Sequence, residues 1–584
     1  MASSAPGTVS LRRWTPLLWS GPALLLGVLL WHTWNDPDIW YHLALGRGVL
    51  LHATASPPEQ VILQQEGFRN FYWIFQLAAF TAHAAAGTVG VRLLFLVVWF
   101  GIFAIWVKTI GGWRSFPALI LVSPAILLCF PRLMERPESF SYLILCLQLL
   151  WLSRLGRVER IPRGTIAVWV ISQVLWTNMH GYFFLGPLVV CLWLGCDLLR
   201  RPFGLTPLRR DAVLLLVLLL LATAVSPFGI GTWKAVGALG TYLRAMRGVI
   251  AEFRPPDFSP PWDFSKALLA GWCVTIVALV AGTLIRLRRL SEPALAVVGL
   301  ALAWYSRRNA PLAVFLSAPL LRLTLDGVAG RFSAGRASKL IPAGIAAVVA
   351  LSCFGFAVQI ATTGSYRPLS GNRRFGSALS PALYPLSAAA YFKDSGFAGR
   401  VFNHPSDGGY LAFQVPALTV YGDSRFVDVP KTREYFRALA NPAPFLQLDR
   451  REGFDGALIN IGEDQSSLLW LLVGPPWEIV SGDLCHAVLV KRSTPVGAAA
   501  PYGRIRLYGG EDLTLPLNAY CAGEWVRSLA AVGRADLFLA ALNQLAEAPN
   551  LPPQVARIAW DVGRANDNRE ILAIAARLSS GGGK

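Results

Sequence analysis

Long apolar segments alternate with short polar ones over the first 362 residues of the chain. Residues 213–225 and 340–361, for example, contain no charged side chain. An apolar helix of about 20 residues crosses a bilayer, and uncharged runs of this kind are far more stable in lipid than in water. The pattern therefore predicts an α-helical polytopic membrane domain over residues 1–362.

Counting the apolar segments gives eleven predicted crossings. A further apolar block, residues 71–86, is interrupted by Gln76 and His83, and counting it as a crossing would place the next basic loop on the wrong side. We expect this block to form an amphipathic juxtamembrane helix in the outer interface. The predicted crossings are residues 15–32, 89–107, 116–130, 139–153, 165–179, 183–199, 211–226, 266–284, 293–305, 311–323 and 340–361.

The formal charge of +19 comes mainly from short groups of basic residues between the apolar segments, beginning with Arg12 and Arg13. Basic loops stay on the cytoplasmic side of a membrane. We therefore expect a cytoplasmic amino terminus and an extracytoplasmic carboxy-terminal part. A nucleic-acid partner is not expected, because it would require a basic face on one domain.

The polar carboxy-terminal part divides into three predicted regions. Residues 363–495 mix helical stretches with short β-rich runs and predict a small extracytoplasmic α/β domain. Residues 496–578 predict helical hairpins that loosely resemble tetratricopeptide repeats, and residues 579–584 a disordered tail. The β-rich runs are residues 400–403, 410–415, 418–421, 457–460 and 487–491.

Eight cysteines are scattered along the chain without zinc-ligand spacing. Only Cys485 and Cys521 lie in the polar part, and they could pair if this part is extracytoplasmic. Pairing and non-pairing both remain open from the sequence.

An acidic segment directly follows the first predicted crossing, with Asp36, Asp38 and His42. One interpretation is an interfacial loop within an aromatic belt. Acidic side chains beside a bilayer are seldom placed there without a partner, however. The second interpretation is a general base, a site for a divalent metal such as Mg²⁺ or Mn²⁺, or both. The sequence does not decide which aspartate is the base.

Further charged residues are expected in the outer loops, where cations are unusual. Each has a structural interpretation, as a local ion pair or a buried histidine. Guanidinium groups also match the geometry of phosphate. Together these residues predict an outer-face cavity for a lipid-linked phosphate, formed by His42, Arg132, Glu135, Arg136, Asn178, His180, Glu252, Arg254, Arg307 and Arg308.

Seven ordered segments over about residues 31–428 resemble a family of bacterial multi-spanning proteins described as GT-C-type glycosyltransferases, related to the protein mannosyltransferase and aminoarabinose transferase group. The segments are DPDIWYHLALGRG, ERPESFSY, WTNMHGYFFLG, SPFGIGTW, EFRPPDF, RRNAPLAVF and VFNHPSDGGYLAF followed by VYGDSRFVD. Phe253 and Ser424 depart from the family pattern, which has tryptophan and glycine there.

The resemblance implies a GT-C-like fold in the bacterial inner membrane, with a juxtamembrane helix on the outer face. It implies a catalytic aspartate in the first outer loop, at Asp36 or Asp38, and binding of the donor phosphate by outer arginines. The implied donor is a polyprenyl-phosphate or polyprenyl-diphosphate sugar, and the acceptor a lipid, glycan or protein. Metal dependence varies within the class.

Two other functions remain compatible with the sequence. A transporter or flippase for a lipid-linked glycan would show charged or broken helices near the bilayer midplane and an internal repeat, and neither is evident. A non-catalytic envelope assembly protein would use the carboxy-terminal hairpins to recruit partners, but it would leave the acidic segment unexplained.

Overall fold

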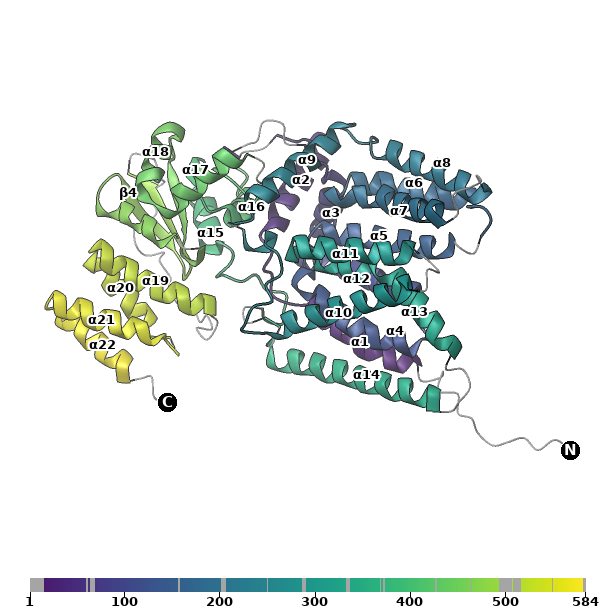
Figure 1. The fold of residues 1–584 in the computed structure, drawn as a ribbon. Coiled ribbons are helices and arrows are strands. Elements are labelled where there is room, and N and C mark those ends of the chain that lie inside the picture. The colour runs from purple at the N-terminus through teal and green to yellow at the C-terminus, as the bar shows by residue number, and fades with distance from the viewer. Residues whose placement is uncertain are drawn as a thin grey trace. The chain divides into compact units, whose positions relative to one another are not determined.

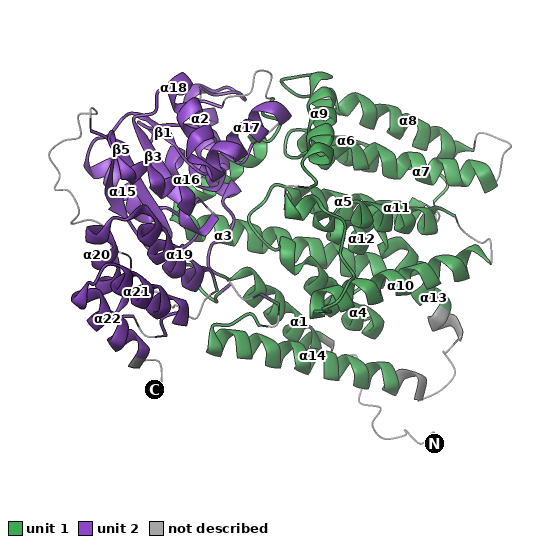
Figure 2. Ribbon diagram, turned by 60° about the vertical axis from the view of Figure 1, so that its left-hand side comes forward, with its two compact units in different colours: residues 1–32, 69–369, 374–377 green, residues 33–68, 370–373, 378–584 purple. Residues whose placement is uncertain are grey.

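The computed structural model divides the chain into two compact units (Figure 2). The helical unit comprises Met1–His32, Arg69–Leu369 and Arg374–Ser377, and the α/β unit comprises Thr33–Phe68, Ser370–Arg373 and Ala378–Lys584. The residues that the structure describes are 15–58, 61–63, 69–155, 158–200, 206–248, 250–285, 290–331, 337–367, 369–370, 373–425, 428–463, 465–492, 507, 516–548 and 550–580. The predicted basic pair Arg12 and Arg13 lies outside them.

The helical unit contains a helix over every predicted apolar segment, and also α9, which the sequence did not predict (Figure 1). Its helices are α1 Thr15–Leu30, α3 Trp73–Ile110, α4 Phe116–Cys129, α5 Glu138–Leu155, α6 Arg163–Thr177, α7 Leu185–Arg200, α8 Pro207–Ala222, α9 Gly231–Ala245, α10 Phe264–Leu284, α11 Ser291–Tyr305, α12 Ala310–Leu316, α13 Ala318–Arg331 and α14 Ala337–Thr363. Short 3₁₀ turns join several of them: η2 Phe130–Arg132, η3 Gly181–Phe184, η4 Ala251–Phe253 and η5 Arg307–Asn309.

Five helical stretches among the described residues are long and apolar enough to cross a membrane: Trp73–Ile110, Gly181–Arg200, Phe264–Leu284, Arg307–Gly327 and Ile341–Thr363. Shorter apolar helices accompany them. A largely helical, multi-pass membrane protein is thus confirmed, whereas the count of eleven crossings stays a prediction.

Helix α3 is kinked. As a straight helix its 38 residues would be about 57 Å long, almost twice the roughly 30 Å of a hydrocarbon core. Ala86 and Gly87 leave the helical conformation, and Gly87 has a φ of 59° that favours glycine. The kink falls between residues 71–86, predicted as a juxtamembrane helix, and residues 89–107, predicted as a membrane crossing.

Helices α1 and α14 pack closely. A Cβ atom at Gly21 would lie 2.1 Å from the carbonyl oxygen of Ala350, so only glycine permits this approach. Small residues at helix contacts allow such packing in lipid, where apolar burial provides little driving force between helices.

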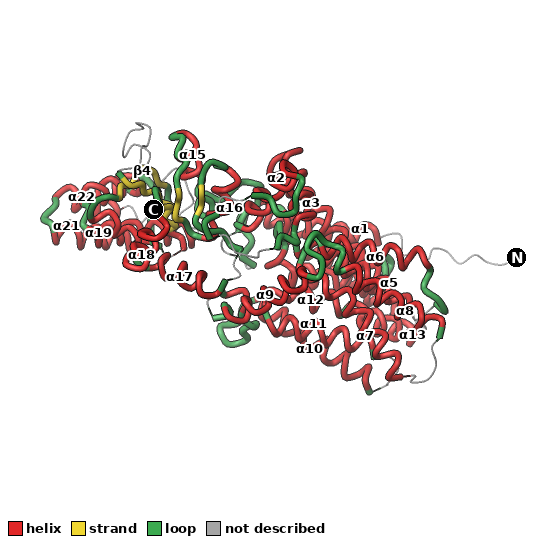
Figure 3. The backbone as a smooth tube through the Cα atoms, turned by 90° about the horizontal axis from the view of Figure 1, so that it is seen from above, coloured by secondary structure: helices red, strands yellow, loops and turns green. Residues whose placement is uncertain are grey.

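The α/β unit contains one five-stranded sheet in the order β2-β1-β3-β5-β4. Figure 3 draws the strands in yellow. The parallel neighbours of β1 are β2 and β3, and β5 is antiparallel to both β3 and β4. The elements are β1 Arg400–Phe402, β2 Thr419–Val420, β3 Gly456–Asn460, β4 Trp477–Gly482 and β5 His486–Lys491, with helices α15 Leu386–Asp394, α16 Pro405–Gln414, α17 Val429–Ala440 and α18 Pro442–Glu452 and the 3₁₀ turns η6 Ile461–Glu463 and η7 Ser466–Val473.

One predicted strand is wrong. Residues 410–415 belong almost entirely to helix α16, whose start explains the error. Pro405 occupies the first turn, where its missing N–H costs nothing, and the ring of His404 accepts a bond from the Ser406 amide. Helix start signals therefore outweigh the β-rich composition. Strand β4 was not predicted.

Four helices follow the sheet, in the region where the sequence predicts helical hairpins: α19 Pro516–Val532, α20 Ala535–Leu545, α21 Pro553–Ala565 and α22 Arg569–Ser580. Cys485, just before β5, and Cys521 on α19 form a disulfide, which settles the pairing that the sequence left open. The tail was predicted to be disordered over residues 579–584. Its first two residues belong to α22, and residues 581–584 lie outside the described part of the chain.

The acidic segment that the sequence placed after the first crossing folds as part of the α/β unit. It contains helix α2, Asp38–His52, which packs against α16. This helix was not predicted.

Candidate functional site

A network of ion pairs joins the ends of several elements in the helical unit. We term Arg132, Arg136, Glu138, Glu252 and Arg308 the arginine cluster. Arg132 pairs with Glu138 and lies 2.9 Å from Glu252, and Arg308 lies 3.4 Å from each of the two carboxylates. Arg136 approaches Glu252 at 3.6 Å. Three guanidinium groups thus share two carboxylates.

Short turns position these side chains. Arg132 ends η2, Glu138 begins α5, Glu252 lies in η4 and Arg308 in η5. The backbones of η4 and η5 are joined, because the Ser306 hydroxyl donates to the Glu252 carbonyl at 2.9 Å. The structure therefore brings together charged residues from three predicted outer loops.

Several donors around the cluster are not satisfied within the described residues. The Nε atoms of Arg132 and Arg308 and the hydroxyls of Ser139 and Tyr142 are buried without a hydrogen-bond partner. A buried donor without a partner costs about 1–3 kcal/mol. These donors could be satisfied by the oxygens of an anion such as phosphate.

Burial alone would raise the pKa of Glu252, but the guanidinium groups of Arg308, Arg136 and Arg132 outweigh it and hold this pKa well below its ordinary value. Glu252 is therefore ionised at every physiological pH. The carboxylate keeps the nearby arginines in place without titrating itself.

His180 lies beside the cluster as a neutral ring. Burial and the positive charges of Arg308 and Arg132 lower its pKa well below the ordinary value. Its Nδ1 receives the Tyr182 amide at 3.4 Å and contacts the Ser141 hydroxyl at 2.9 Å. Because the Ser141 oxygen also accepts from the Trp176 indole at 2.7 Å, its proton can point to Nδ1. The proton of His180 is then on Nε2, which lies 4.0 Å from Glu138.

Glu135 does not join the arginine cluster. It forms a separate buried pair with Arg92 at 2.6 Å. Arg92 also donates to the carbonyls of Leu30 and His32, both at 2.7 Å. This arrangement fixes the end of α1 to α3.

The remaining predicted residues of the helical unit fall into two groups. Asn178 accepts from the Trp73 indole and donates to the Val174 and Val225 carbonyls, each at 2.8 Å, so its amide joins elements of the fold. Arg254 and Arg307 are exposed, and the Arg307 amide donates to the Arg254 carbonyl at 2.9 Å. Both cations therefore remain at the surface next to η4 and η5.

Asp36, Asp38 and His42 belong to the α/β unit. The Asp36 side chain is buried and accepts the Asp38 amide at 3.2 Å, whereas Asp38 is partly exposed. His42 is buried, with its ring 4.0 Å from that of Tyr41. No group of three His, Cys, Asp or Glu side chains suited to a metal occurs among the described residues. A divalent metal held by Asp36 and Asp38 stays a prediction.

The α/β unit contains a second buried charged network, which the sequence did not predict. We term His486, Asp407 and Asp483 the histidine network. The ring of His486 lies 3.0 Å from Asp483 and 3.7 Å from Asp407. Asn460 donates to both oxygens of Asp407 at 3.0 Å. Burial disfavours a charged ring, but Asp483 and Asp407 outweigh it and raise the pKa of His486 to about 10.

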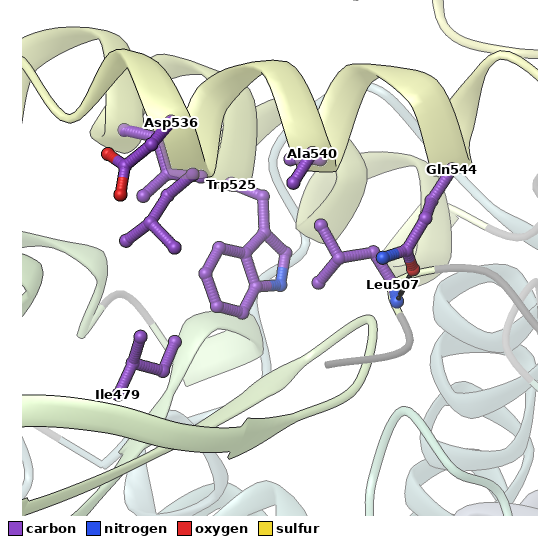
Figure 4. A pocket seen from close by; sticks show the side chains of 9 residues that line it. Ile479, Leu507, Trp525, Asp536, Ala540 and Gln544 are labelled. Carbon is purple, nitrogen blue, oxygen red and sulfur yellow. Dashed lines mark hydrogen bonds between the residues drawn. The ribbon is translucent and has the colours of Figure 1, made fainter. Parts of the chain in front are cut away.

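A cavity of about 240 Å³ lies elsewhere in the α/β unit, between β4, α19 and α20. Figure 4 shows the Trp525 indole between Ile479 of β4 and Ala540 of α20. The lining is mostly apolar, and Gln544 accepts the Leu507 amide at 2.8 Å. The cavity therefore suits an apolar group, and the carboxylate in its lining, Asp536, is paired with Arg534 at 2.7 Å.

Several residues of the site were not predicted from the sequence. Glu138 lies in the segment ERPESFSY but was not predicted to bind a ligand, and no role was predicted for Arg92. A charged residue inside an apolar helix is a strong signal, since it is expensive in lipid and needs a partner. Ser141 and Tyr182 carry no such signal.

No family model and no curated protein sequence matches this chain. Several solved structures match this chain, among them the following three. The apo oligosaccharyltransferase of Archaeoglobus fulgidus has a TM-score of 0.51 at 11% identity, covering 78% of this chain and 71% of that one. The mycobacterial arabinofuranosyltransferase AftD has a TM-score of 0.51 at 15% identity, over 84% of this chain and 40% of that one. ArnT from Cupriavidus metallidurans, bound to undecaprenyl phosphate, has a TM-score of 0.48 at 14% identity, over 83% and 99%.

The first two comparisons agree with the architecture described above. At these identities they establish the fold alone. The structure of this chain resembles GT-C glycosyltransferases.

Proposed function

We propose that this protein is a membrane glycosyltransferase that moves a sugar from a polyprenyl-phosphate-linked donor to an acceptor at the extracytoplasmic face. The observation that carries the proposal is the arginine cluster. Its three guanidinium groups share two carboxylates. Two of its guanidinium Nε atoms and two hydroxyls beside it are buried without a hydrogen-bond partner among the described residues.

The arginine cluster would bind the donor phosphate. Guanidinium groups donate in a planar fork that matches phosphate oxygens, and burial strengthens these bonds. The same contacts become stronger as the phosphate leaves with negative charge, and such interactions lower the barrier for the chemical step. Arg254 and Arg307 would add long-range attraction for the anionic donor.

The acidic segment would supply the base. The carboxylate of Asp36 or Asp38 takes the proton of an acceptor hydroxyl as that oxygen attacks the anomeric carbon. A new glycosidic C–O bond forms, the C–O bond to the lipid phosphate breaks, and its electron pair leaves with the phosphate. Attack opposite to the leaving group inverts the configuration of the anomeric carbon.

Two independent features support the proposal. The oligosaccharyltransferase and the arabinofuranosyltransferase that share this fold are both named for sugar transfer. The Cys485–Cys521 disulfide favours an oxidising compartment for the α/β unit, as expected for a periplasmic domain of a bacterial inner-membrane protein.

The test is transfer of labelled sugar from polyprenyl-phosphate donors in membranes that contain the wild type or a double variant, Asp36→Asn with Asp38→Asn. Removing a general base costs roughly two to four orders of magnitude in rate. We expect the double variant to bind donor but to lose transfer by about this factor. Undiminished transfer would exclude the proposed base.

A further inference from the structure

The acidic segment is attached to the α/β unit by its backbone. Thr33–Phe68 lies in sequence between α1 and α3 but folds with the α/β unit, as the colours of Figure 2 show for α2. The amides of Ile62 and Leu63 donate to the carbonyls of Val420 and Tyr421 at 2.8 and 2.7 Å. The chain after α2 therefore continues the sheet beyond β2.

Helix α2 is packed against α16 by aromatic and charged contacts. The Trp40 ring lies 5.8 Å from Tyr384, 4.9 Å from Tyr410 and 5.7 Å from Phe413, measured between ring centroids. Arg47 donates to the carbonyl of Phe413 near the end of α16 at 3.1 Å, where a cation is favoured by the helix dipole. Trp40 is only 1% exposed, so its side chain belongs to the hydrophobic core between α2 and α16.

Gly409 sets the distance between the two helices. A Cβ atom at this position would lie 2.8 Å from the backbone nitrogen of Tyr41 and 3.1 Å from its Cβ. Neither atom can move without moving α2 itself. Because Asp38 and Tyr41 are one turn apart on α2, any side chain at position 409 would displace the helix that carries Asp38.

The two aspartates have different surroundings. Asp36 is buried, and its carboxylate closes a turn around Pro37 by accepting the Asp38 amide at 3.2 Å. Its carbonyl accepts the Tyr384 hydroxyl at 3.0 Å. Asp38 begins α2 and is partly exposed. Asp36 is thus used in shaping the start of α2, and Asp38 is the more exposed of the two carboxylates.

We propose that Asp38 is the base of the transfer reaction and that Asp36, Tyr384 and Gly409 are positioning residues by which the α/β unit places it. The proposal rests on the proposed glycosyltransferase function. The α/β unit then takes a direct part in catalysis, because the group that removes the acceptor proton is attached to it.

The first experiment separates the aspartates. Asparagine closes the same turn as aspartate, since its side-chain oxygen also accepts a backbone amide. We expect Asp38→Asn to lower kcat by two to four orders of magnitude, as for loss of a base. Asp36→Asn should lower kcat far less than Asp38→Asn does, and Asp36→Ala should lower it tenfold or more, because only alanine opens the turn. An Asp36→Asn variant as inactive as Asp38→Asn would overturn the assignment.

The second experiment tests the positioning residues. We expect Gly409→Ala and Tyr384→Phe to lower kcat tenfold or more with an unchanged KM for the donor, because the phosphate site lies in the other unit. Gly474→Ala is the matched control, since a Cβ there meets no atom within 4 Å. Wild-type kcat in both variants, or a loss confined to KM, would contradict the proposal.

Hydrogen exchange measures the attachment of α2 without relying on catalysis. In the full-length protein in detergent, Gly409→Ala should speed exchange in peptides from α2 but not in those from α19, and Gly474→Ala should change neither. Unchanged exchange of α2 would overturn the positioning role. If exchange changes as expected while wild type transfers no sugar from any polyprenyl-phosphate donor, the glycosyltransferase function fails and the role of Asp38 as its base fails with it.

Discussion

The arginine cluster of the helical unit and the histidine network of the α/β unit are both buried groups of ionised side chains, but they are balanced differently. In the histidine network one imidazolium lies between two carboxylates, and these carboxylates also accept bonds from Asn460, Ser387 and backbone amides. In the arginine cluster cations outnumber carboxylates, and guanidinium and hydroxyl donors remain unsatisfied.

This difference between the two networks indicates different roles. Removing charges from water is expensive, and a buried network repays this only when its polar atoms are satisfied. The histidine network joins β3, β5 and α16. Its carboxylates are satisfied by the protein, and among the described residues only the His486 Nε2, 3.7 Å from Asp407, and the Asn460 Oδ1 lack a hydrogen-bond partner. The arginine cluster is incomplete without a further acceptor, which suits a site for an anionic ligand. Burial of charge by itself therefore identifies neither a structural nor a functional group, whereas the balance of donors and acceptors does.

The largest expected effect lies in the arginine cluster. Arg308→Gln removes a guanidinium that contacts both Glu138 and Glu252. We expect transfer from a polyprenyl-phosphate donor to fall about 10²–10³-fold in kcat/KM, as for other losses of a charge-stabilising donor. Lys266→Gln is the control, because it removes an exposed cation that pairs with Asp257 instead. Equal losses in the two variants would mean that only overall charge matters.

The histidine network should respond in stability. His486→Gln leaves Asp407 and Asp483 buried without their cation, a change that typically costs about 3–5 kcal/mol. We expect a clear drop in the thermal unfolding temperature of the full-length protein in detergent. The KM for the donor should not change in membranes kept below that temperature. If His486→Gln changed the donor KM and left the unfolding temperature unchanged, the histidine network would also act in donor binding, and the contrast with the arginine cluster would fail.

The pH dependence sharpens the same contrast. The pKa of His486 is raised to about 10 in the folded protein, so its stabilisation is fully present below its ordinary pKa of about 6.5 and is lost as pH rises towards 10. The groups facing it are Asp407, Asp483 and His404, whose own pKa is lowered to about 4 by burial. Unfolding temperatures should fall from pH 7 to 10 in wild type and less in His486→Gln. If the unfolding temperatures of wild type and His486→Gln fell equally with pH, the pH effect would arise from groups other than His486.

The smallest effect is expected at the surface. Arg254 is exposed, and its guanidinium donates to the Gly248 carbonyl. Arg254→Gln should raise the donor KM only about two- to fivefold, and the increase should shrink at high ionic strength because exposed charges are screened. A salt-independent loss of the size expected for Arg308→Gln would place Arg254 inside the phosphate site.

The apolar pattern predicted the helices of the helical unit well, because a lipid environment leaves long uncharged runs in the sequence. It missed α9, which begins Gly-Thr-Trp-Lys and lacks such a run. Charges in the predicted outer loops pointed to Arg132, Glu252 and Arg308, because cations are unusual on the extracytoplasmic side of a membrane. The interactions between them depend on turns that no periodicity encodes.

The placement of α2 could not be predicted either. Trp40 packs against Tyr410, a residue 370 positions later in the chain. The sequence around either residue does not predict that contact. The histidine network likewise joins residues from α16 and β5. The sequence around each of these residues, taken alone, is also compatible with a turn. Long-range packing decided both.

The disulfide between Cys485 and Cys521 spans 36 positions in sequence and therefore closes a covalent ring around the connection from β5 to α19. A protease that cuts the chain anywhere inside this ring produces two fragments that remain one molecule until reductant is added. On a non-reducing gel the nicked protein would migrate close to the intact one, and the last four helices would separate only after reduction.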